Sequence, residues 1–121
     1  MLYIGIMSGT SLDGIDAALV EIDQQGQPQL LANLYQQYDT KLQKTLFQLS
    51  QAEEVKLEQL AALDQQLGQR YAACCLALLE KYQYKASDIH AIGCHGQTIR
   101  HQPRPNAFSF QIGDANQLAE L

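Results

Sequence analysis

The chain has 121 residues, of which 46% are apolar, and it carries a net charge of −5. A chain of this length is large enough for one domain, and it can bury roughly two-thirds of the surface that its unfolded state exposes. The acidic balance argues against nonspecific binding to nucleic acid or to an anionic membrane. It does not exclude ATP, because the backbone N–H groups of a glycine-rich loop and a bound Mg²⁺ can supply the positive charge.

The first forty residues predict three short strands. Leu2–Met7 is an apolar run, Ile15–Asp23 alternates apolar and polar positions, and Leu30–Asp39 is a third candidate, although Leu30–Tyr38 also fits the start of a helix. A turn at Gln24–Pro28 separates the second strand from the third. Because the connections are short, we expect these strands to form an antiparallel meander.

A helical region follows the strands. The capping-box spacing, in which Ser or Thr precedes Glu or Gln by three residues, predicts helix starts at Thr40 with Gln43 and at Ser50 with Glu53. Farther along, apolar residues that recur every three or four positions predict an amphipathic helix with one face on a core. These residues are Leu60, Leu63, Leu67, Tyr71, Cys74, Leu78 and Tyr82. Core packing explains Tyr71 and the adjacent cysteines better than a redox or metal site does.

The three cysteines, Cys74, Cys75 and Cys94, form no CxxC pair, and an adjacent pair with one distant cysteine is a poor disulfide framework. We therefore expect buried thiols in a reducing cytoplasm. The apolar run Leu2–Met7 is also too short for the core of a signal peptide or for a membrane span. Both observations favour a cytoplasmic location.

The last third of the chain predicts two more strands. Ile89–Gly96 reads as a strand that ends in a glycine turn, and Phe108–Gly113 as a short alternating strand. A long helix between strands is typical of a crossover that returns in parallel to the same sheet. We therefore expect an α/β fold with a mixed sheet. Asp114 is a good N-cap for a final helix that has no C-cap before Leu121, which predicts that the chain is a fragment.

The first candidate site is the polar turn Gly9–Asp16 between two apolar runs. Gly9 and Gly14 allow a positive φ and a close backbone approach to a ligand, and successive N–H groups in such a turn bind anions. Hydroxyl donors and two carboxylates that suit Mg²⁺ through water accompany them: Ser8, Thr10, Ser11, Asp13 and Asp16. The turn matches neither the Walker A nor the Rossmann pattern. The alternative is a hairpin held by Asx and ST turns.

The second candidate site is Gly93–Pro105, at the end of the expected parallel strand, where α/β sheets place their ligands. Its donors and acceptors suit a polyhydroxylated or anionic ligand: His95, Gln97, Thr98, Arg100 and His101. As a metal set, Cys94, His95 and His101 lack a fourth ligand. A Cys94 nucleophile with His95 as its base is disfavoured, because neighbours on a strand point to opposite faces. The alternative is an ordinary solvated loop, and His90 fits a structural role.

Three segments together resemble the anhydro-N-acetylmuramic acid kinase family: Gly5–Leu19, Ile92–Pro103 and Phe110–Glu120. The resemblance implies the first part of a ribonuclease-H-like, actin-like ATPase domain of the sugar kinase superfamily, over residues 1–121, with the second domain absent. It also implies an enzyme that uses Mg·ATP to phosphorylate O6 of 1,6-anhydro-N-acetylmuramic acid while water opens the anhydro bridge. The product would be N-acetylmuramate 6-phosphate, formed in the recycling of peptidoglycan.

The resemblance also implies roles for the two candidate sites. The first would be the phosphate loop for ATP, comprising Gly9, Thr10, Ser11, Leu12, Asp13, Gly14, Ile15 and Asp16, with Asp13 and Asp16 toward Mg²⁺. The second would line the sugar, through His95, Gly96, Gln97, Thr98 and Arg100. The family's catalytic aspartate belongs to a later DFR motif, which this chain lacks.

Without that aspartate and the second domain, we expect the isolated chain to be inactive as a kinase. The alternatives are a stand-alone nucleotide-binding or interaction module and, less favoured, a small hydrolase that uses His95 and His101. Exposure of surface that an absent half would cover also allows self-association as a homodimer.

Overall fold

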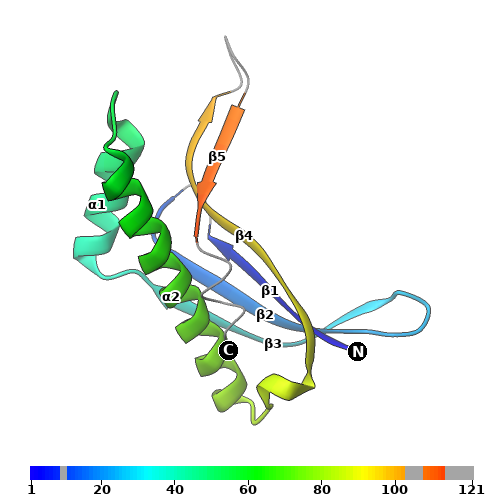
Figure 1. The fold of residues 1–121 in the computed structure, drawn as a ribbon. Coiled ribbons are helices and arrows are strands. Elements are labelled where there is room, and N and C mark those ends of the chain that lie inside the picture. The colour runs from blue at the N-terminus through cyan, green and yellow to red at the C-terminus, as the bar shows by residue number, and fades with distance from the viewer. Residues whose placement is uncertain (9–10, 103–107, 114–121) are drawn as a thin grey trace.

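The structure, a computed structural model, describes residues 1–8, 11–102 and 108–113, without the side chains of residues 100–102 and 108–110 (Figure 1). One five-stranded sheet has the order β3-β2-β1-β4-β5. Its strands are β1 (Leu2–Ser8), β2 (Gly14–Ile22), β3 (Pro28–Gln37), β4 (Ile89–Gln102) and β5 (Phe108–Ile112). The helices are α1 (Thr40–Gln51), α2 (Leu57–Lys81) and the short 3-10 helix η1 (Ala86–Asp88).

The sheet is mixed, as the sequence predicts. Strands β1, β2 and β3 form an antiparallel meander, and β4 returns parallel to β1 after the helices. Strand β5 then pairs antiparallel with β4 at the edge of the sheet. The crossover through α1 and α2 is long enough for a parallel return, which a short turn cannot make. The alternative of a helix beginning at Leu30–Tyr38 is wrong.

Helices α1 and α2 cover one face of the sheet (Figure 1). Alternation along β1 sends Ile4, Ile6 and Ser8 toward the helices, and these three side chains are at most 3% exposed. Leu46 of α1 and Leu67 of α2 are fully buried against them in one core. Burial of a leucine side chain contributes about 1.5–3 kcal/mol, so these apolar faces fix both helices on the sheet.

Helix α2 follows its predicted apolar stripe. Leu63, Leu67, Tyr71, Cys74 and Leu78 are buried on it. At the ends of the stripe, Leu60 is half-buried and Tyr82 is 37% exposed. The helix is long, yet no helix among the described residues is both long and apolar enough to cross a membrane.

All three thiols are free, as expected, but they differ in burial. Cys74 and Cys75 are fully buried, and burial raises their pKa values to about 11 and about 12. Cys94 on β4 is half-buried, and burial also raises the pKa of its thiol. The two adjacent thiols therefore serve as small core residues.

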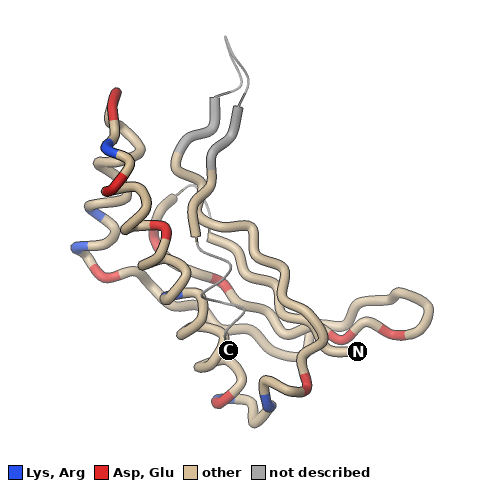
Figure 2. The backbone as a smooth tube through the Cα atoms, viewed as in Figure 1, with Lys and Arg blue, Asp and Glu red and all other residues tan. Residues whose placement is uncertain are grey.

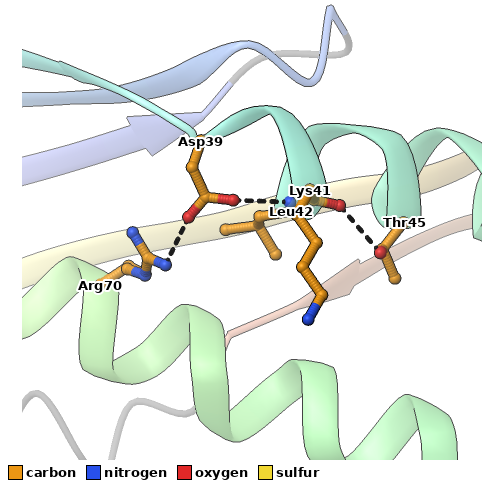
Figure 3. A network of polar contacts seen from close by, with 5 residues as sticks. All are labelled: Asp39, Lys41, Leu42, Thr45 and Arg70. Atoms are coloured by element: carbon orange, nitrogen blue, oxygen red, sulfur yellow. Dashed lines mark hydrogen bonds and ion pairs between the residues drawn. The ribbon is translucent and has the colours of Figure 1, made fainter.

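Helix α1 begins at Thr40, as predicted, but its cap is not the predicted capping box. The N-cap is Asp39 instead of Thr40, and one Asp39 carboxylate oxygen accepts from the Leu42 N–H at 2.8 Å. The other accepts from Arg70 of α2 at 2.7 Å, while Thr45 Oγ1 donates to the Lys41 carbonyl (Figure 3). These accepted bonds lower the pKa of Asp39. Asp39 outcompetes Thr40 because a carboxylate can cap the helix and bind an arginine at once.

The second predicted capping box is also wrong. Ser50 lies in the last turn of α1, where its hydroxyl donates to the Phe47 carbonyl at 2.6 Å. Helix α2 begins only at Leu57, after the N-cap Lys56, which makes no side-chain cap bond. A serine near a helix end can bond back to a preceding carbonyl as readily as it caps a new helix, so the spacing alone does not decide.

The glycine turn predicts that strand β4 ends at Gly96, and this prediction is wrong. The strand continues to Gln102 and forms the hairpin with β5. Ile6 pairs with Cys94, and Ser8 pairs with Gln97. Between these two pairs, β4 advances by three residues while β1 advances by two. The extra residue is a β-bulge at His95–Gly96, where Gly96 has a φ of +82°. The glycine therefore bends a continuous strand and does not terminate it.

Candidate functional site

The first candidate site lies in the turn between β1 and β2. Residues 9–10 fall outside the described residues, so the predicted roles of Gly9 and Thr10 are not placed. The Ser11 hydroxyl donates to an Asp13 carboxylate oxygen at 2.8 Å, and both side chains are exposed. Leu12 between them is only 6% exposed and joins the core. Leu12 therefore anchors the turn in the core, while the side chains of Ser11 and Asp13 face outward.

The positive φ in this turn belongs to Leu12, at +60°, and not to Gly14. A branched residue in this conformation is uncommon, and burial of its side chain in the core offsets the strain. Gly14 is required for space. A Cβ there would lie 2.6 Å from the Gln36 carbonyl oxygen and 2.5 Å from the Tyr35 hydroxyl. The prediction that Gly14 supplies a positive φ is wrong, and close packing of β2 on β3 is the physical reason for the glycine.

Two carboxylates and one phenol share the outer face of this turn. Asp16 of β2 pairs with Tyr35 of β3, and both side chains are exposed. Partial burial raises the pKa of Tyr35, and the negative charges of Asp13 and Asp16 raise it further. Both carboxylates therefore act on the same phenol. Two exposed carboxylates at one turn fit a hard cation that keeps part of its water shell, as Mg²⁺ does.

One described basic side chain, Lys44 of α1, lines a pocket together with Ser11 and Leu12 of this turn. Every Lys and Arg residue whose side chain is described lies between residues 41 and 85, on the helices and the segments that flank them (Figure 2). An anion at the turn could therefore be held by backbone N–H groups, hydroxyls and a cation, with Lys44 nearby. In the described part of the chain, no three His, Cys, Asp or Glu side chains are grouped to hold a metal ion by themselves.

The second candidate site lies on β4, at and after the bulge. His95 is exposed, and its Nδ1 lies 3.3 Å from the Gly96 carbonyl oxygen. Gly96 is buried, and a Cβ there would lie 2.9 Å from the Ile112 carbonyl oxygen of β5. Thr98 is 9% exposed. Arg100 pairs with Phe110 through the strand, but its side chain and that of His101 lie outside the described part.

Gln97 differs most from what its predicted role requires. Its side chain is fully buried. The side-chain oxygen accepts from the Tyr38 hydroxyl at 3.0 Å, and Nε2 donates to the Thr98 carbonyl at 3.1 Å. Contact of Gln97 with a ligand stays a prediction, and in this conformation the amide is engaged inside the protein.

Buried hydrogen bonds join the two candidate sites at Ser8 and Gly96, which are 88 residues apart in the sequence. The Ser8 hydroxyl, just before the first turn, donates to the Gly96 carbonyl at 3.1 Å. It also lies 2.9 Å from the Tyr71 hydroxyl of α2. Because the single hydrogen of Ser8 goes to Gly96, Tyr71 is the donor in the second bond. The Ser8 hydroxyl, which the sequence offers to a phosphate, is therefore committed to holding β1 on β4.

The two tyrosines in this network act as donors. Burial raises the pKa values of both Tyr38 and Tyr71, which are 4% and 0% exposed. Both phenols therefore keep their protons at neutral pH. Sequence reasoning placed Tyr71 in the core but missed its hydroxyl, and it missed Tyr38 as a site residue. The available signal was that a buried tyrosine hydroxyl needs a polar partner.

Helix α2 also holds the residue that follows β5. The Gly113 N–H donates to an Asp64 carboxylate oxygen at 2.6 Å. Gly113 has a φ of +139°, and a Cβ there would lie 2.5 Å from Cε2 of Tyr71. Tyr71 therefore contacts Ser8 at the end of β1 and packs beside Gly113, which directly follows β5. The predicted N-cap Asp114 and the helix after it lie outside the described residues.

Comparison with known proteins decides the family. The family model for anhydro-N-acetylmuramic acid kinase matches residues 1–121. The chain belongs to this family. It is 48% identical over 122 residues to the anhydro-N-acetylmuramic acid kinase of Nitrosomonas europaea and 46% identical over 126 residues to that of Xylella fastidiosa. The kinase of Idiomarina loihiensis is 46% identical over 118 residues.

The chain spans about a third of the length of these curated relatives. The matches cover 97–100% of the chain but only 32% or 33% of each relative. The resemblance seen in the sequence is therefore confirmed for an N-terminal part of the family. The mixed sheet, with β4 parallel to β1 beside an antiparallel meander, agrees with the first part of the ribonuclease-H-like domain that this family implies.

Proposed function

We propose that the complete protein containing this chain is a kinase that uses Mg·ATP to phosphorylate O6 of 1,6-anhydro-N-acetylmuramic acid. Water opens the anhydro bridge in the same reaction, and the products are N-acetylmuramate 6-phosphate and ADP. Membership of the family supports this proposal. The reaction belongs to the recycling of peptidoglycan in the cytoplasm.

The observation that carries the proposal is the bond between Ser8 and the Gly96 carbonyl. It brings the turn that resembles a phosphate loop against the segment that resembles a sugar-binding one. A kinase needs its nucleotide and its acceptor side by side, because phosphoryl transfer depends on positioning and on charge stabilisation. Neither site would serve transfer if the fold separated them.

In this proposal, the turn and β4 bind different substrates. The turn 9–16 receives the phosphates with its N–H groups and with the Ser11 hydroxyl, and Asp13 and Asp16 hold Mg²⁺ through water. Bound Mg²⁺ neutralises charge on the phosphates. His95, Gly96 and Thr98 on β4, with Arg100 beyond them, orient the sugar. Activation of water needs an aspartate from beyond residue 121.

We further propose that residues 1–121 are the N-terminal portion of an actin-like nucleotide-binding domain whose partner domain lies outside the chain. The 121-residue chain then has no useful kinase activity by itself, since it holds only part of each binding site. The small-molecule ligands are ATP and the amino sugar, nucleic acid and membranes are not partners, and self-association into a homodimer follows from uncovered surface.

The test is a coupled assay of ADP release with Mg·ATP and 1,6-anhydro-N-acetylmuramic acid. It compares the 121-residue chain with the protein encoded by its complete reading frame, after circular dichroism has established that both are folded. We expect turnover only from the complete protein. Folded but inactive complete protein would overturn the kinase proposal and favour a nucleotide-binding or interaction module. Turnover by the short chain above a control without enzyme would contradict its proposed incompleteness.

A further inference from the structure

A single tyrosine connects the turn 11–13 with the β4 segment after the bulge. Tyr38 lies between β3 and α1 and is 4% exposed. Its backbone N–H donates to the Asp13 carbonyl at 2.9 Å, so it fixes the exit of the turn. Its hydroxyl donates to the side-chain oxygen of Gln97 at 3.0 Å. Both bonds come from one residue, so a displacement of either segment acts on the other.

The Gln97 amide extends this connection along β4. Its nitrogen donates to the carbonyl of the next residue, Thr98, while its oxygen faces Tyr38. The side chain is fully buried beside Ile112 and the bulge, and its bonds define one orientation of the amide. A buried polar network with defined partners specifies one arrangement of its elements, because shifted arrangements lose these bonds.

From this geometry we propose that Tyr38 and Gln97 are positioning residues, whose hydrogen bond sets the separation and alignment of the phosphate turn and the sugar segment. The proposal rests on the kinase function proposed above, and it assigns Gln97 to alignment in place of direct contact with the sugar. Each substrate would still bind its own segment when the bond is lost. The two reacting groups would then be misaligned, and misplacement by about 1 Å can reduce a rate by about 100-fold.

The kinetic test uses the complete protein with three variants: Tyr38→Phe, Gln97→Met and the double variant. Tyr38→Phe removes one oxygen and keeps the ring in the core. The matched control is Tyr82→Phe, which removes a tyrosine hydroxyl at the C-terminal end of α2. That hydroxyl donates to the Asn33 carbonyl at 3.4 Å and lies away from both segments. Thermal unfolding of every variant separates a loss of activity from a loss of folded protein.

We expect Tyr38→Phe to lower kcat at least tenfold while the KM for ATP and the KM for the sugar each stay within twofold of wild type. The double variant should be no slower than the slower single variant, because both substitutions break the same bond. Tyr82→Phe should keep its kcat. A raised KM for the sugar at unchanged kcat in Gln97→Met would instead indicate direct contact and overturn the proposal. Multiplicative effects, or an unchanged kcat in Tyr38→Phe, would overturn it as well.

Hydrogen exchange separates failure of this proposal from failure of the kinase function. In Tyr38→Phe the backbone amides of residue 38 and of Gln97 should exchange at least tenfold faster than in wild type, and Tyr82→Phe should leave them unchanged. If wild-type protein is inactive, the kinase function fails, and this exchange still decides whether the bond holds the two segments. Unchanged exchange in Tyr38→Phe would overturn the positioning role whatever the activity.

Discussion

Replacement of Gly113 by alanine tests the contact between α2 and the residue after β5. The backbone there has a φ of +139°, which residues with a side chain rarely adopt. The new Cβ would lie 2.5 Å from Cε2 and 3.4 Å from Cδ2 of Tyr71. Tyr71 is fully buried and its hydroxyl is bonded to Ser8, so the ring has no space to retreat. We expect Gly113→Ala to displace the ring or the strand end.

Two terms set the size of this effect. A residue forced into a sparsely populated backbone region costs about 1–3 kcal/mol. Insertion of an extra methyl group into a packed site costs about 1–3 kcal/mol more. The expected loss of unfolding free energy is therefore about 2–6 kcal/mol, a large share of the roughly 5–15 kcal/mol that stabilises a typical domain.

Urea unfolding of Gly113→Ala and Gly26→Ala isolates the contact with Tyr71. Gly26 also has a positive φ, +80°, but a Cβ there meets no atom within 4 Å. Gly26→Ala should therefore lower the unfolding free energy only by the cost of placing a side chain at a positive φ. Combining Gly113→Ala with Tyr71→Leu should cost less than the sum of the two single changes, because the smaller side chain relieves the overlap. Equal losses in the two glycine variants would refute the reasoning.

Three further outcomes follow from burial and charge. Leu67→Ala, at a fully buried position, should cost about 2–5 kcal/mol in urea unfolding, whereas Leu76→Ala, at a 49% exposed position, should cost within about 0.5 kcal/mol; similar losses would contradict the assigned core. Accepted hydrogen bonds lower the pKa of folded Asp39, so its contribution is present above its unfolded pKa and is lost as the pH falls through its folded pKa. Asp39→Asn should therefore lessen the acid dependence of the unfolding midpoint, and an unchanged dependence would refute this role. With pKa values of about 11 and about 12, Cys74 and Cys75 should react with a thiol reagent at pH 8 only after unfolding, and mass spectrometry that finds either residue labelled in native protein would contradict their burial.

Local patterns in the sequence predict most of the fold. The alternation in the first forty residues yields the meander, and the periodic stripe from Leu60 yields α2. The prediction at Ser50 fails because a capping pattern can occur inside a helix end. The prediction at Gly96 fails because one glycine conformation serves both a turn and a bulge, and only pairing with β1 and β5 selects the bulge.

The candidate site is less accessible to sequence reasoning than the fold. The motifs mark the two segments, but they do not reveal that Ser8 and Gln97 point inward. That orientation depends on Tyr38 and Tyr71, which come from other elements and meet these residues only in the folded chain. The positive φ of Leu12 is likewise set by burial of its side chain, which no property of the turn residues alone predicts.

The parallel pairing of β1 with β4 also has a consequence for synthesis on the ribosome. Ser8 and Gly96 are separated by 88 residues, so β1 emerges long before its partner. At typical translation rates this interval is about 4–18 s. The local β1–β2–β3 meander can form early, and it then exposes the unpaired edge of β1, which carries Ile4 and Ile6. Exposed strand edges invite pairing with other chains, so the nascent protein is most prone to aggregate, and most in need of a chaperone, until β4 arrives.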